Sequence, residues 1–237
     1  MPARPEAGPS TARATEAPRV LVIGCGALAR ELLALTRNLP GVKVLCVDAA
    51  LHMRPERIAD AVSARIDQAR RDYGPDLKIF VAYADCGTRG ALDEVLAKAG
   101  VERIVGAHCY EFYAGAATFA ALQDEDPGTF YLTDFLTRQF DTLIIRGLGL
   151  DKHPELLPLY FGNYQRLVYL AQSDDPALMA SARRAAKRLG LGFEHRTTGF
   201  GDLATATVAA TTTGAPGHPG TLARGPCSRA HLWSWPS

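Results

Sequence analysis

The chain lacks three features that would place it in a common class: a long apolar run, an excess of one charge, and closely paired cysteines. No apolar stretch approaches the roughly 20 residues that cross a bilayer, and residues 1–17 lack the apolar centre of a secretory signal. The 26 Lys and Arg nearly balance the 25 Asp and Glu, so the chain has no excess of positive charge that would bind nucleic acid or an anionic membrane. We therefore expect a cytoplasmic protein that binds neither.

The cysteines and the common catalytic motifs exclude further classes. The count of 5 cysteines is odd, and no C-x-x-C pair is present, which argues against a disulfide framework and a zinc ribbon. The G-x-S-x-G, H-E-x-x-H and Walker-type patterns are also missing, so the common serine hydrolases, zinc proteases and P-loop enzymes are not indicated.

The order of predicted elements indicates an α/β protein. Residues 1–17 are rich in Pro, Ala and Thr and predict a disordered leader, 18–202 predict a single α/β domain, and 203–237 predict a disordered or aberrant tail. Alternation of strands and helices predicts a Rossmann-like three-layer sandwich with a largely parallel sheet. The expected strands are 19–24, 42–48, 78–85 and 101–106, and the expected helices are 29–39, 55–73, 91–100 and 108–123.

The second half has a less regular pattern. Residues 154–172 carry several aromatics at helical spacing and predict a long amphipathic helix. The Asp-Asp-Pro sequence before residue 177 predicts the start of a second helix, over 176–190, and a late strand is expected over 191–199.

The first strand leads into a G-x-G-x-x-A sequence. Gly24, Gly26 and Ala29 match a dinucleotide fingerprint, and Asp48 ends the next strand at a suitable distance. The glycines would then be cofactor-binding residues. Two alternatives stand beside this interpretation: a tight strand–helix turn that needs small residues, and a loop whose purpose is to present Cys25.

Three cysteines, Cys25, Cys86 and Cys109, each lie where a predicted strand ends. In a doubly wound sheet of order 2-1-3-4, strands one, three and four are neighbours, so these thiols would share one crevice. Three thiolates with one open position can hold a reactive zinc ion or a 4Fe–4S cluster with one unique iron. The alternative is core packing, which is the usual role of a free cysteine and the one expected for Cys46.

Polar residues flank these cysteines. His52, His108, Asp85 and Glu111 are candidates for acid/base or metal-positioning roles, although an ordinary structural histidine or a helix N-terminal carboxylate explains each equally well. Further candidates for binding a cofactor or an anionic substrate group are Arg54, Gly87 and Asn163.

Several segments together resemble the family known as domain of unknown function 1638. They are GCGALARE (24–31), LHMRPE (51–56), YADCG (83–87), AHCYEF (107–112), PGTFYLTDFL (127–136) and YFGNYQRLVYL (160–170). The resemblance implies a Rossmann-like sandwich and no settled activity. Members tend to carry three cysteines and a histidine at the positions of Cys25, Cys86, Cys109 and His52. The resemblance also suggests a methyltransferase or corrinoid partner. Many members have HDC where this chain has His108-Cys109-Tyr110, so the acid next to the histidine is missing here.

The sequence thus predicts a metal- or iron–sulfur-binding α/β protein that accepts a small-molecule substrate. Three rivals remain open: a NAD-dependent oxidoreductase that uses the glycine loop, a non-enzymatic protein that delivers a metal or cofactor, and thiol chemistry without metal. In the last case Cys86 or Cys109 would be the nucleophile and His108 the base.

Overall fold

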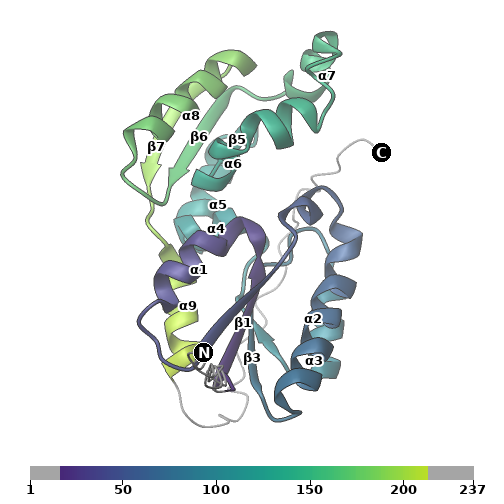
Figure 1. Ribbon diagram of the computed structural model, residues 1–237. Helices are drawn as coiled ribbons and strands as arrows, with labels where there is room; N and C mark the ends of the chain where they lie inside the picture. Colours follow the sequence, from purple (N-terminus) through teal and green to yellow (C-terminus); the bar gives the residue numbers. More distant parts are fainter. Residues whose placement is uncertain (1–16, 213–237) are drawn as a thin grey trace, which may run out of the picture.

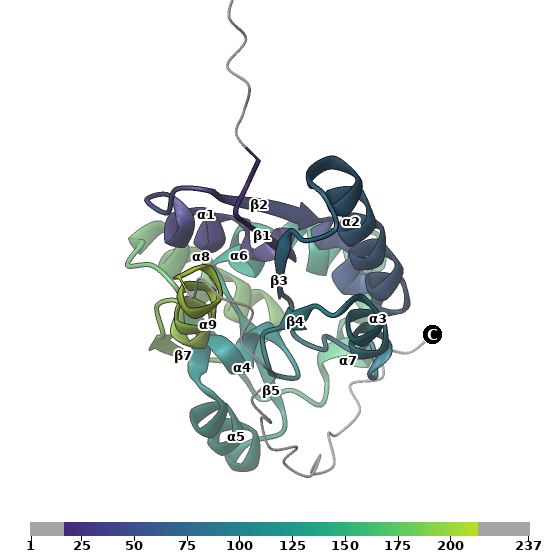
Figure 2. The ribbon, with the colours of Figure 1, turned by 90° about the horizontal axis from the view of Figure 1, so that it is seen from below.

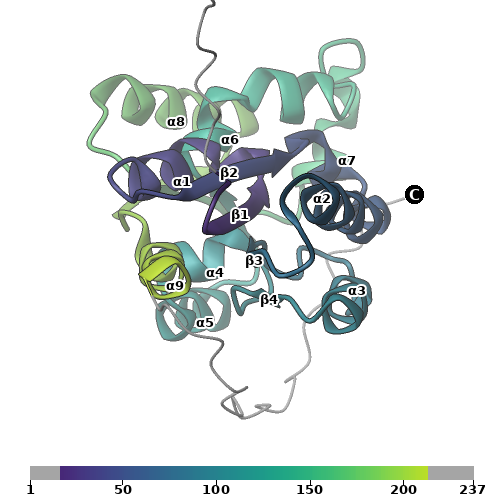
Figure 3. The same cartoon turned by 60° about the horizontal axis from the view of Figure 1, so that its bottom comes forward.

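A four-stranded parallel sheet forms the first half of the molecule. The structure, a computed structural model, describes residues 17–212, so most of the expected leader and the end of the expected tail lie outside it. The strand order is β2-β1-β3-β4 (Figure 3), which confirms the order predicted from the sequence. The strands are β1 (Val20–Cys25), β2 (Val42–Val47), β3 (Lys78–Ala82) and β4 (Glu102–Arg103).

Helices cover both faces of this sheet because β1 alternates its buried side chains between them. Leu21 and Ile23 pack with α2 and α3, whereas Val22 packs with α1, α4 and α9. Figure 2 shows α2 and α3 on one side of the strands and α1 and α9 on the other. The helices are α1 (Ala29–Thr36), α2 (Ile58–Tyr73), α3 (Ala91–Ala99), α4 (Cys109–Ala114) and α9 (Gly201–Thr212), with short 3-10 turns at η1 (Gly26–Leu28), η2 (Ala49–Met53) and η3 (Pro55–Arg57).

A second parallel sheet, of order β5-β6-β7, forms the other half. Phe119 and Leu122 of α5 pack on one face of it, and α6, α7, α8 and a π-helix pack on the other. These elements are α5 (Ala116–Glu125), β5 (Thr129–Leu132), α6 (Asp134–Arg138), the π-helix (Phe140–Arg146), η5 (Pro154–Leu156), α7 (Leu157–Phe161), β6 (Arg166–Ala171), α8 (Pro176–Leu189) and β7 (Gly192–Thr197). The chain is therefore a Rossmann-like three-layer α/β protein whose strands are divided between two sheets.

The long helix predicted over 154–172 is wrong. Only residues up to Phe161 are helical, and 166–171 form β6, the central strand of the second sheet. The run from Leu167 to Ala171 is buried on both faces, and such a continuous apolar run looks the same whether it is a strand or a buried helix.

Two other expectations need correction. The helix predicted over 108–123 is broken at Gly115, whose φ of +81° interrupts it, so α4 and α5 are separate helices. The disorder predicted from residue 203 is wrong as far as Thr212, since α9 continues to that residue and buries Leu203, Thr207 and Thr211; the rest of the predicted tail lies outside the described residues. These three residues are four apart and therefore lie on one side of the helix.

The carboxyl edges of the two sheets face each other (Figure 1). The η1 turn, which follows β1, contacts α6, which follows β5. We call the β2-β1-β3-β4 sheet with its helices the first lobe, and the β5-β6-β7 sheet with α5 to α8 the second lobe. Strand-end residues of both lobes therefore meet in the middle of the molecule.

Within residues 17–212, none of the helices combines the length and apolarity that a membrane span needs.

Candidate functional site: a thiol-lined cavity between the lobes

A cavity of about 840 Å³ lies between the two carboxyl edges. On the first lobe it adjoins the point where the strand order reverses between β1 and β3, which is where open α/β sheets bind ligands. Of the residues predicted from the sequence, the lining includes His52, Asp85, Cys86, Gly87, His108 and Cys109.

The loop after β3 is held in shape by Asp85. Its Oδ1 accepts hydrogen bonds from Thr88 Oγ1 (2.7 Å) and the Gly90 amide (3.0 Å), and its Oδ2 accepts from the Gly87 and Arg89 amides (3.2 Å each). Burial alone would raise the pKa of Asp85, but these hydrogen bonds outweigh it and lower the pKa. Asp85 is thus ionised, and hydrogen bonds within its own loop already occupy both of its carboxylate oxygens.

This loop places Cys86 in an unusual conformation. Its φ is +48°, in the left-handed region that non-glycine residues seldom adopt. Gly87 follows with φ +85°, and a Cβ added there would lie 3.3 Å from Pro55, so the loop passes close to the turn that carries His52. Backbone strain of this kind is concentrated at functional sites, where surrounding structure holds it in place.

The loops after β3 and β4 are joined through their backbones. The Asp85 amide donates to the Gly106 carbonyl (3.0 Å), and the Cys86 amide donates to the Ala107 carbonyl (2.7 Å). The Ala107 amide in turn donates to Glu111 Oε2 (2.6 Å). Glu111 therefore fixes the loop that leads to Cys109, and it is not among the described residues lining the cavity.

The three predicted thiols lie in one neighbourhood. Cys86 and Cys109 line the cavity, while Cys25 lies behind them, hydrogen-bonded to the hydroxyl of Tyr83. Burial raises the pKa of Tyr83, and the three cysteines raise it further. All three cysteines also pack against one core cluster of the first lobe, which includes Val22 and Phe112. The strand ends thus bring the three cysteines to one region of the first lobe, whereas the described cavity lining includes only Cys86 and Cys109.

All three thiols are protonated in the metal-free protein. Burial raises the pKa of Cys25, of Cys86 and of Cys109, the last to about 12. For Cys86 and Cys109 the neighbouring cysteines add to this effect, since two thiolates repel each other. A cysteine nucleophile needs the opposite shift, toward a stable thiolate.

Burial also disfavours the charged forms of the two cavity histidines, His52 and His108. Burial lowers the pKa of His52, and proximity to His108 lowers it further. Burial also lowers the pKa of His108, against the opposing influence of Glu111 and Asp85. The Nδ1 atom of His108 is buried, and no hydrogen-bond partner for it is found in the described part of the chain. A neutral imidazole with an unsatisfied nitrogen beside thiols is suited to bind a metal or a polar ligand atom.

The dinucleotide fingerprint has a packing explanation. A Cβ on Gly24 would lie 2.3 Å from Leu32 Cδ1, and one on Gly26 would lie 2.9 Å from the Val47 carbonyl oxygen. Asp48 accepts a hydrogen bond from the Ala50 amide (2.8 Å) and caps the following turn. These three residues are not among those described as lining the cavity.

Two other predicted residues lie elsewhere. Arg54 and Asn163 are exposed, and the described cavity lining includes neither of them. Asn163 occupies the turn between α7 and β6, where its carbonyl oxygen faces Gly128. The expected roles of these two residues in ligand binding therefore receive no support from their positions.

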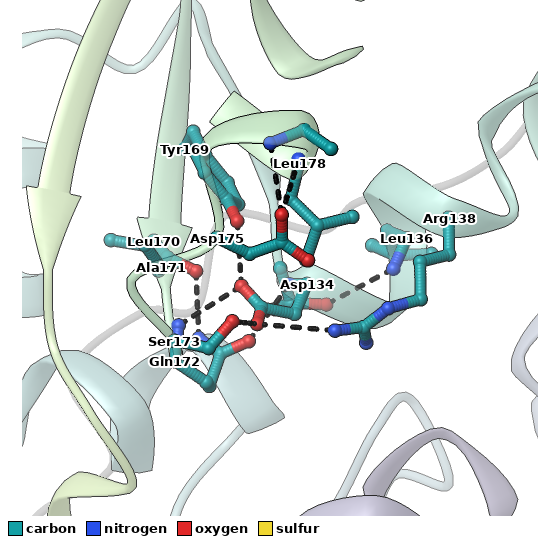
Figure 4. A network of polar contacts seen from close by, with 12 residues as sticks. Asp134, Leu136, Arg138, Tyr169, Leu170, Ala171, Gln172, Ser173, Asp175 and Leu178 are labelled. Carbon is teal, nitrogen blue, oxygen red and sulfur yellow. Dashed lines mark hydrogen bonds and ion pairs between the residues drawn. The ribbon is translucent and has the colours of Figure 1, made fainter. Parts of the chain in front are cut away.

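The sequence did not point to a buried polar cluster in the second lobe, centred on Asp134 (Figure 4). Its Oδ1 accepts from the Tyr169 hydroxyl (2.7 Å) and the Gln172 amide (3.0 Å), and its Oδ2 accepts from Ser173 Oγ (2.5 Å). Arg138 also approaches it, at 3.4 Å. The cluster ties the ends of β5 and β6 together. The Thr-Asp pair directly after a buried strand was the signal in the sequence.

A second unpredicted residue is Glu31, in α1. It is only 4% exposed, and its Oε2 atom has no hydrogen-bond partner among the described residues. Burial raises the pKa of Glu31, and the carboxylate of Asp134 raises it further. Glu31 also contributes to the raised pKa of Cys109, which is set mainly by burial.

The side chains as they stand do not form a finished metal site. Within residues 17–212, no group of three or more His, Cys, Asp and Glu side chains has an arrangement that could hold a metal ion. The thiols are also free of disulfides. The donor types fit a thiolate-held metal, whereas their present geometry does not yet enclose one.

Comparisons with known proteins give one match. No curated protein and no solved structure matches the chain. A family model described as "Protein of unknown function (DUF1638)" matches residues 46–207, which is more than half of the chain and includes Cys86, Cys109 and both cavity histidines. Cys25 precedes the matched region. By this match, and in agreement with the resemblance noted in its sequence segments, the chain belongs to the DUF1638 family.

Proposed function

We propose that this protein binds a metal ion or a 4Fe–4S cluster through Cys25, Cys86 and Cys109, with the open coordination position facing the cavity between the lobes. The observation that supports the proposal is that all three cysteines pack against the same core cluster of the first lobe. The ends of three adjacent parallel strands bring these cysteines together although they are far apart in sequence.

The electrostatics of the site favour a cation. Three buried thiols with raised pKa values are poor nucleophiles by themselves, but a bound metal supplies the positive charge that allows them to ionise. His52 or His108 is then a fourth ligand or a group that positions the ligands. Binding requires the thiols to rotate toward a common ion from their present orientation.

Bound zinc would activate a thiol or water for attack, and a cluster would act as a Lewis acid or electron carrier. The chain's own residues hold the ligands and exclude water, since the cavity is closed on one side by the buried core of the second lobe. A small-molecule substrate is the expected occupant. A methyltransferase or corrinoid partner stays a prediction that rests on the family resemblance.

The two enzymatic rivals are less well supported. The NAD interpretation used Gly24, Gly26 and Asp48, whose positions are explained by packing and by a local cap. The metal-free thiol interpretation requires a stabilised thiolate, and the pKa shifts have the opposite direction. Delivery of a metal to another protein remains the alternative use of the same site.

The proposal is tested by purifying the full chain without oxygen and measuring metal content by mass spectrometry together with the visible spectrum. One ion or cluster per chain is expected, and charge-transfer absorbance distinguishes iron–sulfur from zinc. The variants C25S, C86S and C109S should each lower the bound metal about tenfold or more. Cys46, which pairs with Gly24 on the neighbouring strand and is not among the described residues that line the cavity, gives the matched control C46S, which should retain it.

Two results would overturn the proposal: wild-type protein without stoichiometric metal, or metal retained equally by all four serine variants. If the metal is present but no thiol or methyl donor is turned over, the delivery role is supported instead of catalysis.

A further inference from the structure

One corner of the cavity is built from aromatic rings of α4, α5 and β5. The rings belong to Tyr110, Phe119 and Tyr131, and all three residues line the cavity. The ring centroid of Tyr131 lies 5.2 Å from that of Phe119 and 5.6 Å from that of Tyr110. The ring of His108 adjoins this aromatic corner, 6.2 Å from Phe119. Rings grouped in this way offer faces and edges against which a planar ligand can pack.

Gln123 brings an amide group to the aromatic corner. It lies four residues after Phe119 on α5, so the two side chains lie on one side of the helix, and both line the cavity. Gln123 is half-buried, and none of the hydrogen bonds found among the described residues uses its side chain. A primary amide carries a donor and an acceptor side by side, and both are available here.

The hydroxyl of Tyr131 is a second available polar group. The residue is only 2% exposed, and no hydrogen-bond partner for its hydroxyl is found within residues 17–212. Arg166 donates to Thr129 Oγ1 (2.9 Å) and to the Leu122 carbonyl (3.5 Å). The end of α5, where Gln123 lies, is therefore beside the start of β5. A buried hydroxyl without a partner is costly, and a ligand that bonds to it removes this cost.

The carboxylates and the guanidinium of the described lining lie outside the aromatic corner, on loops of the first lobe. Glu56 and Arg89 are exposed, and the oxygens of Asp85 are engaged in its own loop. The π-helix and the residues that follow it add apolar side chains to the lining, namely Leu143, Ile144 and Leu148. A ligand in the corner therefore meets ring surfaces, an amide and a hydroxyl.

We infer that the aromatic corner binds a planar ring compound whose edge carries an N–H donor beside a C=O acceptor, as in a lactam. The planar ring follows from the aromatic side chains, and the edge groups follow from the Gln123 amide and the Tyr131 hydroxyl. A cavity of about 840 Å³ has room for such a small molecule. The inference goes beyond the proposed function and does not rest on it, because neither Gln123 nor the three rings belong to the proposed metal ligands.

The inference is tested by calorimetric titration of the full chain, as purified and after treatment with a chelator. The probe is carbostyril, a flat bicyclic lactam. Its N-methyl analogue lacks the donor, and its fully saturated analogue keeps the lactam edge but has no aromatic ring. Each analogue should bind at least about fivefold more weakly than carbostyril, since one loses a hydrogen bond and the other loses aromatic packing.

Two variants locate the binding. Q123L removes the amide and Y131F removes only the hydroxyl, and each should lower the affinity for carbostyril at least about fivefold. The difference between carbostyril and its N-methyl analogue should also shrink in Q123L. The matched control is Q68L, which should bind like wild type, because Gln68 is exposed on α2, bonds to Asp72 and is not among the residues described as lining the cavity.

Three results would overturn the inference: no binding of carbostyril, equal affinity for all three probes, or unchanged affinity in either Q123L or Y131F. The metal assay described above separates this inference from the proposed function. Carbostyril binding by protein that is purified without metal would support the inference and overturn the metal proposal. Stoichiometric metal in protein that does not bind carbostyril would do the reverse.

Discussion

The backbone amide of Cys86 donates a hydrogen bond of 2.7 Å to the carbonyl oxygen of Ala107. This bond joins the loop after β3 to the loop after β4, beyond the point where the two strands pair as a ladder. It therefore fixes the distance between the segments that carry two of the three site cysteines. The position of these thiols is set by backbone pairing, and substitutions at their side chains should leave the loops in place.

Replacing Tyr83 with phenylalanine should weaken metal binding. Tyr83 is buried in the core cluster against which Cys25 and Cys86 pack, and its hydroxyl bonds to Cys25, so it orients the ligands without being one. Loss of such a partner typically lowers metal affinity about 10–100-fold. Competition with a chromophoric chelator measures this change, and Y73F, at the last residue of α2 and outside the described cavity lining, is the control that should keep wild-type affinity. Equal affinity of Y83F and wild type would contradict a positioning role.

The E31Q variant should be more stable than wild type at neutral pH. Because burial raises the pKa of Glu31, the native state binds more protons than the unfolded state, and its stability falls as pH rises through that pKa. Glutamine removes this penalty, so we expect thermal unfolding to shift upward by about 2 °C or more at neutral pH. The gain should shrink near pH 4, where both states hold the proton.

The matched control for this prediction is E102Q, because Glu102 is exposed on β4. That variant should unfold at the wild-type temperature at both pH values. A gain for E31Q that is independent of pH would mean that charge is not the cause.

The D134N variant should destabilise the second lobe. Both the Tyr169 hydroxyl and the Gln172 amide donate to Asp134 Oδ1, and an amide in its place cannot accept every one of the bonds that Asp134 receives. Loss of buried hydrogen bonds to a charged acceptor should lower the free energy of unfolding by about 2 kcal/mol. Chemical denaturation measures this loss, and D124N, at an exposed position of α5, should change it by less than about 0.5 kcal/mol.

Cys109 should react slowly with iodoacetamide in chelator-treated protein. Since burial raises its pKa to about 12, fewer than ~1 in 10,000 of these thiols are ionised at neutral pH. Mass spectrometry of the alkylated peptide should show a rate that still increases at pH 10. A rate equal to that of free cysteine at neutral pH would restore the metal-free nucleophile hypothesis.

The first lobe could be predicted from its sequence because its strands are separated by clear helical patterns and glycine stops. The second lobe was only partly predictable. The run from Leu167 to Ala171 is apolar at every position, and hydropathy alone does not distinguish a buried strand from a buried helix. In α9 the buried positions include Thr207 and Thr211, so the inward face of this helix carries no apolar signature.

For the site, the sequence identified the groups that topology brings together, and it missed those that depend on tertiary packing. The strand ends predicted the convergence of Cys25, Cys86 and Cys109. The burial of Glu31 could not be predicted, because it depends on how α1 packs in the folded chain, which residue type does not reveal. Asp85 and Glu111 were identified as acid/base candidates, but their neighbouring amides make them loop supports, which residue type alone does not reveal.

The close approach of Gly26 to the carbonyl oxygen of Val47 has a consequence for the sulfur atoms. A methyl group at residue 26 would wedge the end of β2 away from β1, and Cys25 is the last residue of β1. The thiol would then tilt out of line with its two partners. The glycine pattern resembles a nucleotide fingerprint in the sequence. In this molecule its role is structural, because it allows the ends of β1 and β2 to pack closely beside Cys25.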